Sequence, residues 1–189
     1  MPTPSPSEPL PIDERFLRTL EENFPGLRMI AKEESALQRW IGRLLWVITL
    51  GGQNAYLEDY TTVFGKTIYT PRSWSKRSPE ERYFTLRHEA VHLEQFKRLG
   101  KFKMAFLYGI WILPMGLAWG RARLEWEAYA ETLRAVAEIK GLEAAASLRE
   151  HIVKQFVGPA YGWMWPFRRA VEKWFDEELE RIRKTTKAS

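Results

Sequence analysis

The chain has no cysteine and only three histidines among its 189 residues. The lack of cysteine excludes a disulfide framework and a zinc site built on thiolates, so any metal must be held by His, Asp or Glu. The Pro-rich residues 1–11 lack the basic segment and apolar run of a secretory signal peptide. We therefore expect 1–11 to be a flexible lead and the protein to be cytoplasmic.

The charge balance gives little indication of a nucleic-acid partner. The net charge of +5 comes from dispersed Lys and Arg, and the densest basic stretch lies at the end of the chain. The length suits one domain, which we expect over 12–182, followed by a basic tail over 183–189. We predict no binding to nucleic acid and make no prediction of the oligomeric state.

Most of the sequence has the apolar spacing of amphipathic helices. Such segments lie at 12–24, 35–51, 78–99, 122–140, 142–156 and 166–184. A short apolar run at 27–31 is consistent with a strand. The strongest β signal is at 60–70, which is rich in β-branched and aromatic residues and is followed by Pro71. Within it, Gly65-Lys66 fits a two-residue hairpin turn, or Gly65 fits a bulge in one long edge strand.

One helix carries two of the three histidines. It is predicted to start at Ser78-Pro79-Glu80-Glu81, a capping box with Pro in the first turn, and to end at Gly100. The segment His88-Glu89-Ala90-Val91-His92 lies in its middle. Residues four apart on a helix face the same way, so both imidazoles can bind one ion with Glu89 beside them, which is the zincin geometry.

A catalytic zinc site needs a third protein ligand and one open position. The remaining histidine, His151, is one candidate, and the carboxylates of 123–131 are richer ones. Gln95, three residues past His92, could touch a neighbouring element, but a polar position on the helix surface is the simpler interpretation.

The second helix resembles that of the gluzincins, the thermolysin-like clan of zinc metallopeptidases. Glu127-Ala128-Tyr129-Ala130-Glu131 matches the Glu-x-x-Ala-acid part of the clan pattern, and Trp126 stands where the clan has Asn. The resemblance implies that Glu127 is the third ligand of a single Zn²⁺ and that Glu131 orients a ligand histidine. Glu125 is the substitute candidate for the third ligand.

The resemblance also implies a fold and a reaction. The fold would be a mostly helical α+β domain with a small antiparallel hairpin or edge strand before the histidine helix, along which a peptide substrate binds. Zinc would activate water, with Glu89 as the general base. Tyr161 is the tentative oxyanion stabiliser, and Tyr129 and His151 are further candidates.

Three other interpretations compete with a peptidase. The uncharged run 104–120 approaches the length of a membrane-spanning helix, but we expect buried core there, or a loop in peripheral contact with a membrane. A di-iron carboxylate protein would use Glu89-x-x-His92 and would need a second such motif, which the sequence lacks. A non-catalytic helical protein would bind a membrane surface or a partner without metal.

Overall fold

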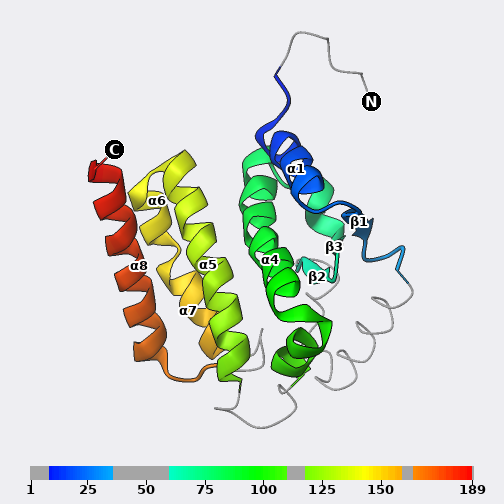
Figure 1. The fold of residues 1–189 in the computed structure, drawn as a ribbon. Helices are drawn as coiled ribbons and strands as arrows, with labels where there is room; N and C mark the ends of the chain where they lie inside the picture. The colour runs from blue at the N-terminus through cyan, green and yellow to red at the C-terminus, as the bar shows by residue number, and fades with distance from the viewer. Residues whose placement is uncertain (1–8, 36–59, 110–117, 159–163, 189) are drawn as a thin grey trace. The chain divides into compact units, whose positions relative to one another are not determined.

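The structure is a computed structural model that describes residues 9–35, 60–109, 118–158 and 164–188. The chain forms two compact units, 1–86 and 87–189, and the elements can be followed by colour in Figure 1. The expected domain over 12–182 is thus built from two units. Most described residues are helical and the remaining regular structure is one small sheet, so the predicted mostly helical α+β class is confirmed.

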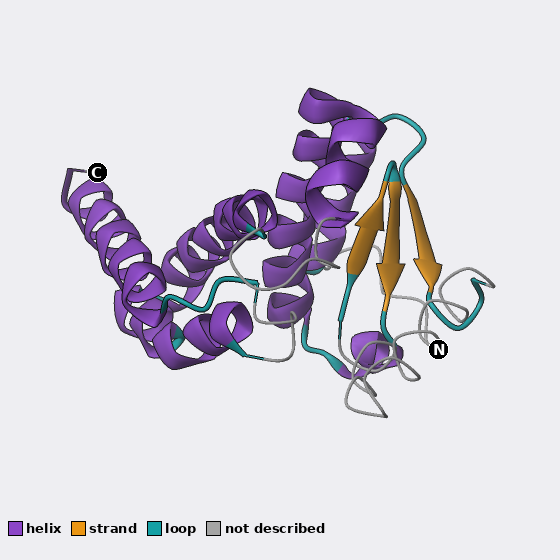
Figure 2. Ribbon diagram, turned by 90° about the horizontal axis from the view of Figure 1, so that it is seen from below, coloured by secondary structure: helices purple, strands orange, loops and turns teal. Residues whose placement is uncertain are grey.

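The first unit contains the sheet, drawn in orange in Figure 2. Its three strands are β1 (Arg28–Ala31), β2 (Thr62–Phe64) and β3 (Thr67–Thr70), in the order β1-β3-β2. β2 and β3 form an antiparallel hairpin with Val63 opposite Ile68, whereas β1 runs parallel to β3.

Residues 60–70 form a hairpin with its turn at Gly65-Lys66, which is the first of the two predicted alternatives. Gly65 has a φ of 62°, a conformation that glycine adopts without steric cost. The alternative of one long bulged edge strand is wrong, since β3 lies in the middle of the sheet. Substrate binding along an edge of this sheet stays a prediction.

Helix α1 (Ile12–Asn23) and the first turns of α4 (Pro79–Gly109) complete the regular structure described for the first unit, together with the 3-10 helix η1 (Arg72–Lys76). Phe16 of α1 meets Tyr83 of α4 edge to face, and Arg82 donates to Asp13 at 2.6 Å. The helix predicted over 35–51 lies, from residue 36 on, outside the described residues.

Helix α4 starts at the predicted capping box. The backbone N–H of Glu81 donates to Ser78 Oγ, and the Glu81 carboxylate accepts from the backbone N–H of Ser78. The predicted end of the histidine helix at Gly100 is confirmed, and the helical segment that follows Gly100 was not predicted. Gly100 has φ 76° and ψ 162°, which breaks the helix, but helical structure resumes and continues to Gly109.

The second unit holds the rest of α4 and four further helices among its described residues. These are α5 (Trp119–Lys140), α6 (Leu142–Ser147), α7 (Arg149–Val157) and α8 (Arg168–Ala188). α5 packs against α6 and α8, and α7 packs against α8. Their core includes Leu133, Phe156 and Phe175, all buried. α8 continues through 183–188, so this part of the predicted tail is helical.

Candidate metal centre

The two histidines of α4 face a carboxylate from α5. His88 and His92 are one helical turn apart, and their ring centroids lie 5.0 Å from each other. Glu125 Oε2 lies 3.8 Å from Nε2 of His88 and 3.8 Å from Nε2 of His92. One potential ligand atom from each of these side chains lies within 4.8 Å of the others. We call these three residues the His-His-Glu cluster.

The spacing of the cluster fits a small metal ion. Ligand atoms bound to a tetrahedral zinc at about 2.0–2.1 Å lie roughly 3.3–3.4 Å from one another. The distance of 3.8 Å from Glu125 Oε2 to each histidine therefore needs an adjustment of a few tenths of an ångström, which side-chain rotation can supply. Two imidazoles and one carboxylate are also ligand types that zinc commonly takes in catalytic sites.

Gln95 fixes the orientation of His92. Its side-chain amide is buried, and Nε2 donates both to the carbonyl of Leu124 at 3.0 Å and to Glu127 Oε2 at 2.9 Å. Both of these groups only accept hydrogen bonds, so the amide oxygen must be the atom that faces His92 Nδ1 at 2.9 Å. His92 Nδ1 therefore carries a proton, and in the neutral ring the lone pair is on Nε2, which faces Glu125.

Thr132 fixes the orientation of the His88 ring. Its hydroxyl donates its single proton to the carbonyl of Ala128 at 3.1 Å, and Oγ1 lies 3.1 Å from His88 Nδ1. The hydroxyl oxygen thus accepts from Nδ1–H, which leaves the Nε2 lone pair of a neutral His88 facing Glu125. A ligand histidine that donates its other ring N–H to a fixed acceptor is the usual arrangement around protein-bound metals.

Glu125 is suited to act as an anionic ligand. Its side chain is 4% exposed, and this burial acts to raise the pKa of the carboxyl group. In the protonated form of the two rings, a hydrogen bond from His88 and the positive charges of His92 and His88 act in the opposite direction, as does the guanidinium of Arg121. Together they lower the pKa of Glu125 from 4.5 to about 2, so the carboxylate is ionised at neutral pH.

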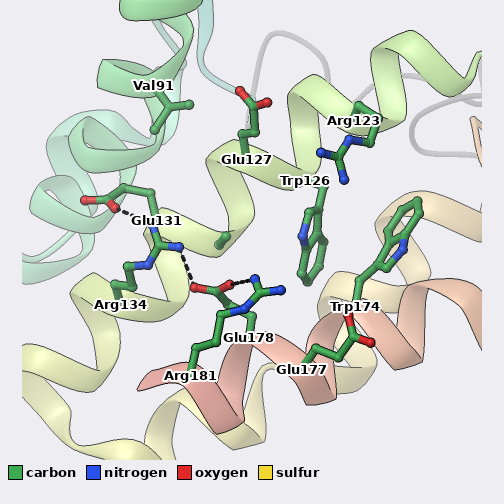
Figure 3. A pocket seen from close by; sticks show the side chains of 11 residues that line it. Val91, Arg123, Trp126, Glu127, Glu131, Arg134, Trp174, Glu177, Glu178 and Arg181 are labelled. Carbon is green, nitrogen blue, oxygen red and sulfur yellow. Dashed lines mark hydrogen bonds and ion pairs between the residues drawn. The ribbon is translucent and has the colours of Figure 1, made fainter. Parts of the chain in front are cut away.

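Glu125, the substitute candidate for the third ligand, lies beside the two histidines, and Glu127 is not part of the His-His-Glu cluster. Two residues along a helix are about 200° apart around its axis, so both cannot face α4 in the same way. Glu127 accepts hydrogen bonds from Gln95 at 2.9 Å and Arg98 at 3.0 Å. It also lines a cleft of about 450 Å³, shown in Figure 3, together with Trp126 and Trp174.

Glu131, predicted to orient a ligand histidine, instead pairs with arginine side chains. Its carboxylate accepts from Arg87 Nε at 2.6 Å and from Arg134 at 3.4 Å, and it lines the same cleft (Figure 3). The histidines are instead oriented by neutral groups, Thr132 and Gln95. No prediction from the sequence included Thr132, and the interpretation of Gln95 as a polar position on the helix surface is wrong, because Gln95 is buried. The available signal was their spacing, since Thr132 follows Glu125 by two helical turns and Gln95 follows His92 by three residues.

The other predicted residues have different surroundings. Glu89 is buried on α4, next to His88 in sequence. The Tyr129 ring lies edge-on to His88 with a centroid distance of 4.9 Å, so this oxyanion candidate is close to the cluster. His151 is exposed on α7 and lies 3.5 Å from Gln155. Tyr161 lies outside the described residues, and its role stays a prediction.

The apolar run 104–120 is only partly described. Met104 is buried in α4, and Trp119 is exposed at the start of α5. Within the described parts of the chain, no helix is both long and apolar enough to cross a membrane.

The chain was compared with three sets of known proteins. Neither protein-family models, nor curated proteins, nor solved structures gave a match to this chain.

Proposed function

We propose that the chain is a zinc-dependent peptidase of the gluzincin type with a His-His-Glu ligand set. The observation that carries the proposal is that Nε2 of His88 and Nε2 of His92 each lie 3.8 Å from Glu125 Oε2, with Nδ1 of each histidine held by a hydrogen-bond acceptor. Three protein ligands leave one position open for water and substrate, as catalytic zinc sites require.

The reaction assigns a separate task to Glu89. When bound, zinc would supply a Lewis acid that lowers the pKa of water and polarises the carbonyl of the substrate. Glu89 would take a proton from the attacking water as the new C–O bond forms. It would then pass this proton to the amine that leaves as the C–N bond breaks. Its place in the sequence, directly after His88, is the one that this role requires.

A single-metal site fits the cluster better than a di-iron centre. A di-iron site takes a carboxylate from each of several helices and two Glu-x-x-His motifs. Among the described residues, the cluster contains one carboxylate, Glu125, and does not include Glu89. Glu89 is therefore assigned as the general base and not as a ligand.

Metal content and cleavage test the proposal in two steps. The purified chain should contain one zinc per molecule by elemental analysis, or take one up on reconstitution. His88→Ala and His92→Ala should lose the metal. His151→Ala is the matched control, because it removes the third histidine, which is exposed on another helix. Absence of bound metal in the parent chain, before and after reconstitution, would overturn the proposal.

Peptide cleavage is then measured on a mixture of unstructured peptides by mass spectrometry. Glu89→Gln should keep the zinc and lower the cleavage rate by about 10²–10⁴-fold, the usual contribution of a general base. If Glu89→Gln loses the zinc instead, Glu89 is a ligand and the mechanism is wrong. If the parent binds zinc but cleaves no peptide, the cluster is a metal site without peptidase activity.

A further inference from the structure

The part of α4 beyond the break at Gly100 presents aromatic side chains to solvent. Phe102 is 93% exposed and Phe106, one turn further on, is 67% exposed. Two residues four apart share one face of a helix, so the two rings form a continuous apolar strip. Met104, between them in sequence, is buried.

The start of α5 adds a third aromatic side chain at the same end of the unit. Trp119 is 53% exposed, and its ring lies 5.9 Å from the guanidinium of Arg123. The next residue, Gly120, approaches α4 so closely that an added Cβ would lie 2.5 Å from Leu107 Cδ2. Trp119 is therefore near the helical turn that carries Phe106.

The sequence that carries these rings has charged residues of one sign only. From Gln95 to Leu124 the sequence has six Lys and Arg and no Asp or Glu. Lys101 and Lys103 are exposed on either side of Phe102. We name Lys101, Phe102, Lys103, Phe106, Trp119 and Arg123 the basic aromatic surface.

We propose that the basic aromatic surface binds the surface of an anionic phospholipid membrane. Exposed Phe and Trp rings enter the boundary between headgroups and acyl chains, and flanking Lys and Arg bind the anionic headgroups. A second copy of the chain fits this surface less well. A symmetric contact brings the same patch of two molecules together, so Lys101 and Lys103 would meet like charges. The proposal does not depend on zinc chemistry.

Sedimentation with phospholipid vesicles tests the proposal on the full chain. Binding should be strong to vesicles of phosphatidylcholine with phosphatidylserine, weak to phosphatidylcholine alone, and reduced by salt. K101E/K103E should weaken binding to the anionic vesicles at least about 25-fold, because each basic residue near such a surface contributes about fivefold. F102Q/F106Q should weaken it at least about tenfold through the loss of buried apolar area.

Matched variants on other parts of the second unit serve as controls. F167Q removes another exposed ring, and K173E/K184E reverses two lysines of α8 that are each 75% exposed. Both controls should bind anionic vesicles nearly as the parent does. Because all changed side chains are exposed, zinc content and the circular dichroism spectrum should stay unchanged in every variant.

Three results would overturn the proposal. One is equal binding to neutral and anionic vesicles, or no binding to either. Another is a loss of binding in the controls as large as in K101E/K103E. The third is a dimer in sedimentation velocity that F102Q/F106Q dissociates, which would assign the surface to a second copy of the chain.

Discussion

Two sides of helix α5 carry carboxylates, and their partners differ. On one side Glu125 faces the imidazoles of His88 and His92. On the other side Glu127 and Glu131 line the cleft of Figure 3. The first side is buried against two imidazoles of α4. The carboxylates of the second side accept from arginine side chains, including Arg87 and Arg98 of α4, and are partly open to solvent.

The comparison shows that a carboxylate becomes a metal-ligand candidate through the groups that it faces. Glu131 is already balanced by Arg87 and Arg134, and Glu127 by Arg98. An arginine stays protonated, so it competes with a metal for the carboxylate. A neutral imidazole instead offers a lone pair that can bind the same metal ion as the carboxylate. The side with Glu125 is thus suited to a cation, and the other side is suited to structural ion pairs.

The largest expected effect comes from removing the carboxylate of the cluster. Glu125→Ala should weaken zinc binding more than about 100-fold, which is the upper end of what a residue outside the ligand set contributes. Titration with a competing chelator measures the affinity. If Glu125→Ala binds zinc as tightly as the parent, the cluster is not the metal site and the difference between the two sides of α5 has no functional meaning.

Metal removal should lower the stability of the folded chain. Zinc at a free concentration 100 times its Kd should raise the free energy of unfolding by about 2.7 kcal/mol, provided that it binds only the folded state. Denaturant unfolding with zinc and with a chelator measures this difference. Glu125→Ala is the control and should show little stabilisation by zinc. Stabilisation of this variant equal to that of the parent would place the ion elsewhere.

A smaller effect is expected from the groups that orient the histidines. Gln95→Leu and Thr132→Val remove the acceptors of His92 and His88, and each should weaken zinc binding by about 10–100-fold. Both variants should also change the absorption spectrum of the cobalt-substituted protein, because each lets a ligand imidazole move relative to the metal. Thr132→Ser keeps the hydroxyl, so its zinc affinity and its cobalt absorption spectrum should both match those of the parent. No rescue by serine would indicate a packing role for Thr132.

The smallest effect on zinc is expected from the cleft side of α5. Glu127→Ala removes one of the two acceptors of the Gln95 amide, and the carbonyl of Leu124 remains. We expect zinc affinity to fall by less than about tenfold, below the range for groups that contact a ligand histidine directly. A loss as large as that of Glu125→Ala would restore Glu127 as the ligand and remove the distinction between the two sides.

Local patterns predicted most of the elements because their causes are local. The capping box at Ser78 and the positive φ of Gly65 depend on residues within a few positions of each other. The pairing of β1 with β3 joins residues about forty positions apart, and no short-range pattern indicates it. The helical continuation beyond Gly100 was missed because glycine ends many helices but also permits a break between two.

The sequence by itself indicated the candidate metal-binding pair and the helix that presents it, because a spacing of four residues places His88 and His92 on one face of any α-helix. It also limited the third ligand to a few carboxylates of α5. Which of Glu125 and Glu127 faces the two histidines was decided only by the tertiary structure, since it depends on how α5 is rotated about its axis when it packs. The same packing brings Thr132 to Nδ1 of His88, whereas Gln95 reaches Nδ1 of His92 from within α4.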